Sequence, residues 1–179
     1  MKKTLMIISC VVVTAVVMST TCSFSEARAR ANDICLPQRE KAKIVSETKG
    51  MDSDDIIDYC VARTCKLLRF SSSNEPIRYH EVSGANCVNY AKLCAAMCDV
   101  ALDANGYNCR ATPVVGYVKT MGVNVNTVLS GLLFWSDRWS SFTKDHDFVK
   151  IQFPDKTVYV DASMKDLFGT SQKQTIENE

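Results

Sequence analysis

The chain has 179 residues, of which 46% are apolar, with 21 Lys and Arg against 20 Asp and Glu. This length and balance are typical of one ordinary globular domain, and a net charge of +1 gives no argument for a nucleic-acid partner. The sequence has nine cysteines, which is more than an average composition gives. The cysteines therefore raise two questions first, the redox state of the cellular compartment and the chemistry of the thiols.

Residues 1–29 have the features of a secretory signal peptide. Two lysines precede an apolar run from residue 5 to residue 18, and the polar stretch after it ends in Ala27-Arg28-Ala29, a small-x-small cleavage pattern. We therefore expect an exported protein, secreted, periplasmic or at the cell surface, with a single domain over residues 30–179. An uncleaved anchor and a lipid on Cys22 are the alternatives, and only these would bring membrane contact.

Cleavage would leave an odd number of cysteines, which suggests one unpaired thiol beside up to three disulfides of undetermined pairing. Cys87 is the candidate for the unpaired thiol. Zinc is a rival use of cysteines, but no Cys-x-x-Cys occurs and Cys94 with Cys98 lacks a second ligand pair. We therefore expect no metal and no other cofactor. The remaining cysteines are Cys35, Cys60, Cys65, Cys87, Cys94, Cys98 and Cys109.

Two helices are predicted first along the chain. Residues 38–48 form a short polar pattern that Gly50 ends, which is typical of a surface helix. Ser53, followed by two aspartates, is the expected N-cap of a second helix to residue 68, with apolar residues at three- and four-residue steps. The polar stretch 71–76 breaks this pattern, and a loop or short strand follows up to Ser83.

A longer helix is predicted from Cys87 to Ala104, because no Gly or Pro interrupts it and Asn105-Gly106 is a stop signal. Cys87 would lie in its first turn. There the free backbone N–H groups and the helix dipole favour a thiolate over a thiol. A buried structural cysteine is the alternative, and it is the usual fate of this residue type.

The second half of the chain favours strands. Residues 108–118 predict a strand, with a kink at Pro113, whereas 119–145 have no clear pattern. The apolar patch 132–135 and Trp139 are predicted to be core residues, or else the wall of a substrate groove.

A β-hairpin is predicted from alternating residues at 148–153 and 157–160, with its turn at Pro154-Asp155. Residues 170–179 are polar and are expected to be a frayed tail. Since helices come first and strands follow, the fold class is α+β.

The hairpin brings a histidine and an aspartate together. A two-residue turn pairs residues whose numbers sum to 309, which places His146 and Asp161 on one face. A three-residue turn would separate them. On one face, the carboxylate would orient the imidazole, which would deprotonate a thiol packed against the sheet. Cys87, His146 and Asp161 are therefore the candidate catalytic triad.

These segments resemble the transglutaminase-like superfamily over about residues 80–165. The resemblance is carried by Gly84-Ala85-Asn86-Cys87-Val88-Asn89-Tyr90-Ala91, by residues 105–111, by Asp145-His146-Asp147-Phe148 and by Val158-Tyr159-Val160-Asp161. Two positions depart from the family pattern, since Phe148 stands where Trp is frequent and Ala162 where Pro is common.

The resemblance implies a papain-like α+β core, in which the nucleophile's helix packs on an antiparallel sheet that supplies His and Asp. It implies Cys87 as nucleophile, His146 as general base and then acid, and Asp161 as the residue that orients it. The backbone N–H of Cys87 would be one oxyanion donor.

The expected function is that of an exported cysteine peptidase, amidase or protein-glutamine acyltransferase that acts on a peptide or protein through a thioester. Hydrolysis is favoured over acyl transfer to an amine, since no residue of the sequence indicates a binding site for an acceptor amine. An NlpC/P60-type peptidase is a related possibility that Asp161 disfavours. The alternative from another class is a non-catalytic, disulfide-stabilised binding module of the cell surface, with Cys87 in a disulfide.

Overall fold

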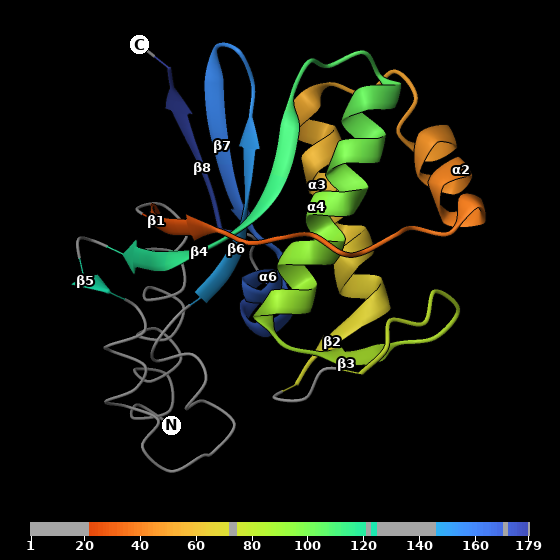
Figure 1. Ribbon diagram of the computed structural model, residues 1–179, viewed down its shortest axis with the longest axis horizontal. Helices are drawn as coiled ribbons and strands as arrows, with labels where there is room; N and C mark the ends of the chain where they lie inside the picture. The colour runs from red at the N-terminus through yellow and green to blue at the C-terminus, as the bar shows by residue number, and fades with distance from the viewer. Residues whose placement is uncertain (1–21, 72–74, 121–122, 125–145, 170–171, 179) are drawn as a thin grey trace, which may run out of the picture.

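The computed structural model describes residues 22–71, 75–120, 123–124, 146–169 and 172–178, and it has an α+β fold (Figure 1). A curled antiparallel sheet lies on one side and the helices on the other, with α4 between the sheet and α2. The elements are β1 (Cys22–Ala29), α2 (Gln38–Glu47), α3 (Ser53–Leu67), β2 (Leu68–Phe70), β3 (Ser83–Ala85), α4 (Cys87–Ala104), β4 (Arg110–Thr120), β5 (Val123–Asn124), β6 (His146–Gln152), β7 (Lys156–Asp161), α6 (Ala162–Phe168) and β8 (Gln172–Glu177).

The main sheet has the strand order β1-β4-β6-β7-β8, and each neighbouring pair is antiparallel. The short strand β5 pairs with the end of β4. The strands β2 and β3 form a separate parallel pair that leads directly into α4. The prediction of helices packed on an antiparallel sheet is therefore confirmed at the level of the fold class.

Helix α4 has the bounds that the sequence predicts. Its N-cap is Asn86, whose side chain accepts a hydrogen bond from Val88 N at 3.0 Å. It ends where Gly106 takes the left-handed conformation, with φ +81°. Most of its apolar side chains are fully buried between the sheet and α3. A helix that is apolar on several faces is expected at the centre of the molecule, and α4 lies there.

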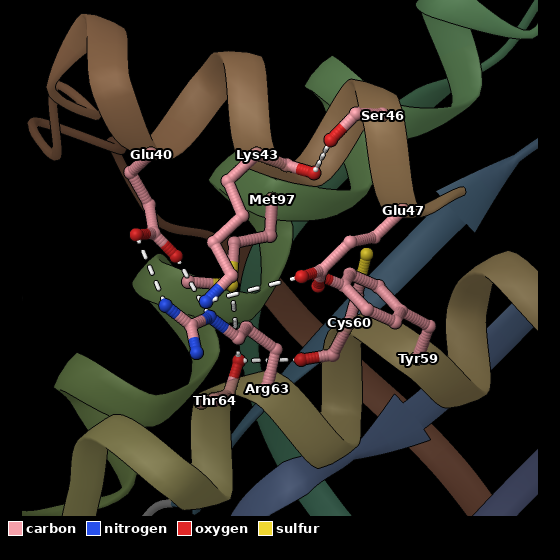
Figure 2. Close-up of polar contacts among 9 residues, drawn as sticks. All are labelled: Glu40, Lys43, Ser46, Glu47, Tyr59, Cys60, Arg63, Thr64 and Met97. Atoms are coloured by element: carbon pink, nitrogen blue, oxygen red, sulfur yellow. Dashed lines mark hydrogen bonds and ion pairs between the residues drawn. The ribbon is translucent and has the colours of Figure 1, made fainter. Parts of the chain in front are cut away.

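Helix α2 is held against α3 by polar side chains (Figure 2). Arg63 donates two hydrogen bonds to the buried carboxylate of Glu40, at 2.8 and 3.1 Å, and Tyr59 donates to Glu47 at 2.5 Å. Ile44 of α2 is also fully buried, so this helix has an inner face that its polar sequence did not indicate.

The N-cap of α3 differs by one residue from the sequence prediction. Asp52, and not Ser53, accepts a hydrogen bond from the backbone N–H of Asp55, at 2.8 Å. Asp and Ser are both favoured N-cap residues, and since Asp52 takes this place the helix begins at Ser53 itself.

The register of the β6–β7 hairpin agrees with the sequence prediction. Val149 pairs with Val160 and Gln152 with Thr157, and the two-residue turn is closed by Phe153 N donating to Lys156 O at 2.8 Å. His146 and Asp161 lie just beyond the last of these pairs. The apolar residues of both strands that face α4 join its core.

Residues 22–29 form strand β1, although the sequence predicted a domain that begins at residue 30. β1 pairs with β4 over its whole length, with a bulge between Glu26 and Arg28. Gly116 of β4 makes this pairing possible, because a Cβ atom there would lie 2.0 Å from the backbone oxygen of Ser25. Phe24 then stacks on the aromatic ring of Tyr159 at 5.8 Å. Cleavage after Ala29 stays a prediction, and it would remove this strand.

The C-terminal segment also differs from its prediction. Residues 172–177 form β8, which pairs with β7, where a frayed tail was expected. Asn178 fixes its end with a backbone hydrogen bond to Asp155 O at 2.8 Å. A polar edge strand is held by main-chain hydrogen bonds, so its composition gives little signal.

Some predictions concern residues outside the described ranges. The patch 132–135, Trp139 and the apolar run of residues 5–18 are among them. Within the described ranges, no helix has the length and apolar character needed to cross a membrane.

Candidate functional site

Cys87 is the first residue of α4, directly after the Asn86 cap. The pairing of β3 with β2 fixes the approach to this position, and the backbone N–H groups of the first helical turn lie beside it. The side chain is 8% exposed, so the thiol lies just beneath the surface. The sequence prediction of a cysteine at a helix N-terminus is confirmed by this geometry.

His146 and Asp161 are in contact, as the hairpin register requires. Their side chains form a hydrogen bond between the imidazole Nε2 and the carboxylate Oδ2, and both residues are fully buried. The second oxygen of Asp161 accepts hydrogen bonds from the hydroxyl and the N–H of Ser163, at 2.7 and 3.0 Å, and from Met164 N at 3.2 Å. Asp161 thus caps α6, and this cap fixes the carboxylate that faces the histidine.

The environment of His146 favours its charged form. Burial lowers the pKa of the imidazole, but the carboxylate of Asp161 and then the thiol of Cys87 raise it, and the result is a pKa of about 10. Cys87 acts on it by a side-chain hydrogen bond as well as by charge, so the two side chains are within interaction range. The structure therefore brings together all three residues that the sequence singled out.

Two further residues border the thiol, and the sequence analysis did not select either. Asp147 of β6 lies with its Oδ2 atom 3.9 Å from the Sγ atom of Cys87, and it is only 3% exposed. Arg30, directly after β1, binds both carboxylate oxygens of Asp147 through Nε and Nη2, the latter at 3.3 Å. The N-terminal segment is thereby joined to the site.

Strand alternation would have indicated Asp147. Successive residues of a strand point to opposite faces, so the face of His146 includes Phe148, and the face of Asp147 includes Val149. Val149 packs in the core with α4, so a hairpin on α4 directs Asp147 towards that helix. His146, the first residue of β6, leaves the strand on the opposite face, beside Phe148. No comparable local signal exists for Arg30, because its position depends on the pairing of β1 with β4.

The cysteines whose side chains the structure describes are all free thiols, which corrects the expectation of disulfides; they are Cys35, Cys60, Cys65, Cys87, Cys94, Cys98 and Cys109. Cys60, Cys94 and Cys98 are fully buried between α3 and α4, where they pack as small apolar groups. Contact with Cys98, and then burial, raise the pKa of the Cys94 thiol well above its usual range. Burial likewise raises the pKa of Cys65 to about 12. The thiols of Cys94 and Cys65 are therefore held in the protonated, unreactive form.

A cavity of about 810 Å³ lies between the segment after β1, helix α4 and strand β4. Arg30 lines it together with Arg110, Lys150 and Asp99, while Cys87, His146 and Asp161 do not. Of the residues named above at the thiol site, Arg30 is the one that also lines the cavity.

The fold and the site together define an α+β protein with a buried Cys–His–Asp cluster where a helix N-terminus meets an antiparallel sheet. Comparison of the chain with family models, curated proteins and solved structures finds no match. The family resemblance accordingly stays a hypothesis that rests on the motifs. In the ranges that the structure describes, no group of three or more His, Cys, Asp or Glu side chains could hold a metal ion.

Proposed function

We propose that this protein is an exported thiol enzyme of the transglutaminase-like type, with a papain-like arrangement of its catalytic core. The observation that carries the proposal is the buried chain of contacts from Cys87 to His146 and from His146 to Asp161. A nucleophile, a base and a residue that orients the base are the parts that covalent amide chemistry requires.

The proposed reaction starts from an ion pair, in which His146 already carries its proton and Cys87 is the thiolate. Asp161 holds Nε2 of the ring, which leaves Nδ1 as the atom proposed to exchange the proton with the thiol. The thiolate sulfur then bonds to an amide carbonyl carbon, and the imidazolium returns the proton to the leaving amine as the C–N bond breaks. The products of this half-reaction are a free amine and a thioester on Cys87.

The second half-reaction consumes the thioester. His146 takes a proton from an incoming water, the water oxygen bonds to the acyl carbon, and the C–S bond breaks to release an acid and the thiol. An incoming amine would give a new amide instead. We favour hydrolysis of a peptide or protein substrate, with the backbone N–H of Cys87 as an oxyanion donor at the positive end of α4.

Alkylation by iodoacetamide across pH tests the proposal, with each modified cysteine identified by mass spectrometry. Cys35 is an exposed free thiol of the same chain and gives the rate of an ordinary cysteine. We expect Cys87 to react faster than Cys35 at pH 6, although Cys87 is the more buried of the two. His146→Ala should remove this advantage, whereas His80→Ala, at an exposed position, should leave it unchanged.

The opposite result has an equally definite meaning. A Cys87 that reacts more slowly than Cys35 at every pH, or that is found in a disulfide in the exported protein, is not an activated nucleophile. The protein would then be better described as a binding module whose cysteines are structural.

A further inference from the structure

The described residues place two charged groups of opposite sign against Cys87. The His146 imidazole, held by Asp161, is the positive group. The Asp147 carboxylate, 3.9 Å from the sulfur, accepts a hydrogen bond from the thiol, and its negative charge opposes a thiolate. The ionisation of Cys87 therefore depends on how well the charge of Asp147 is neutralised.

Arg30 supplies that neutralisation. Its guanidinium holds both oxygens of Asp147 in a two-point contact, which is the strongest geometry for a carboxylate partner. Asp147 is 3% exposed, so water cannot replace the guanidinium without reorganisation, whereas the Arg30 side chain is 30% exposed and can be reached from outside.

The position of Arg30 is fixed by the main chain. Its N–H donates to Pro113 O at 2.8 Å, which continues the pairing of β1 with β4 by one residue. Ala29, the last residue of β1, pairs with Val114. The guanidinium therefore reaches Asp147 from a backbone that the sheet holds in place.

We propose that Arg30 is a positioning residue of the thiol site, which keeps the charge of Asp147 neutralised so that Cys87 can ionise at neutral pH. The inference rests on the proposed function, since it concerns the same thiol. The charged and titratable groups that face the thiol are His146 and Asp147 on β6, with Asp161 on β7 and Arg30 after β1 behind them.

Three variants separate this role from a merely structural one: Arg30→Gln, Asp147→Asn and the double variant. The measurement is the pH midpoint of Cys87 alkylation in the full chain, relative to Cys35. Arg30→Gln leaves a bare carboxylate beside the sulfur and should raise the midpoint by about one pH unit, or about tenfold in rate at neutral pH. Asp147→Asn leaves the Arg30 cation without its carboxylate and should lower the pH midpoint. In the double variant, the midpoint should be close to that of the wild type.

Opposite shifts in the two single variants support the inference, because loosening of the structure would shift both in the same direction. Equal midpoints in wild type and Asp147→Asn overturn it, and this comparison holds even if Arg30→Gln fails to fold. The wild type alone shows whether the proposed function fails. In that case Cys87 is alkylated no faster than Cys35, and the alkylation rate of Cys87 does not change in His146→Ala.

Discussion

The charge on His146 should make the stability of the protein depend on pH. Asp161 and Cys87 outweigh the effect of burial and raise the imidazole pKa from 6.5 to about 10. A shift of this size corresponds to about 5 kcal/mol in the free energy of unfolding. Because the folded pKa is the higher one, the contribution is complete below pH 6.5 and is lost as the pH rises towards 10.

The contribution can be isolated by comparing Cys87→Ala with Cys87→Ala/His146→Gln. Removal of Cys87 matters because an unfolded cysteine titrates near pH 8.5, in the same window. Glutamine stays neutral at every pH and keeps an amide near the Nε2 position. In the single variant Asp161 still raises the pKa of His146, so we expect it to lose about 2 to 5 kcal/mol more than the double variant between pH 6 and pH 10.

The assay is urea unfolding at intervals of one pH unit from 6 to 10, followed by circular dichroism. A parallel loss of stability in both variants would refute the reasoning. It would mean that His146 is neutral in the folded protein and that its contact with Asp161 is an ordinary neutral hydrogen bond. The proposed base would then start from the unprotonated form.

Two further predictions concern packing around the site. Gly116→Ala should lower the free energy of unfolding by about 2 kcal/mol or more, because the new Cβ atom would clash with Ser25 O and separate β1 from β4. A change below about 0.5 kcal/mol in urea unfolding would contradict this close approach of the two strands. Glu40→Gln should lower the free energy of unfolding by about 1 to 3 kcal/mol, because Arg63 loses its charged partner. Lys43→Gln is the control, since the exposed ion pair of Lys43 with Glu47 should contribute less than about 0.5 kcal/mol.

The parts of the fold that follow from local patterns could be predicted from the sequence. Helix α4 agrees at both ends because its cap and its stop signal are adjacent to its apolar pattern. The β6–β7 register agrees because a two-residue turn leaves a single possible pairing. These two elements carry Cys87, His146 and Asp161, which explains why three site residues could be selected without a structure.

The parts that depend on distant partners could not be predicted. Strand β1 lies in a segment with the composition of a signal peptide, and its pairing with β4 depends on the absence of a side chain at Gly116. The number of cysteines led to a wrong expectation of disulfides. A count of cysteines does not tell whether two of them, such as Cys60 and Cys98, are covalently joined or only packed in one core.

The two neighbouring residues of β6 connect the site to two other parts of the chain. His146 is held by Asp161, while Asp147 is held by Arg30 directly after β1. Cleavage after Ala29 would retain Arg30, but it would remove the strand that fixes it and turn its amide into a terminal ammonium group beside Pro113 O. If the protein is exported as we propose, and if Arg30 must stay in place for Cys87 to ionise, the active form retains residues 22–30 and any cleavage lies before β1.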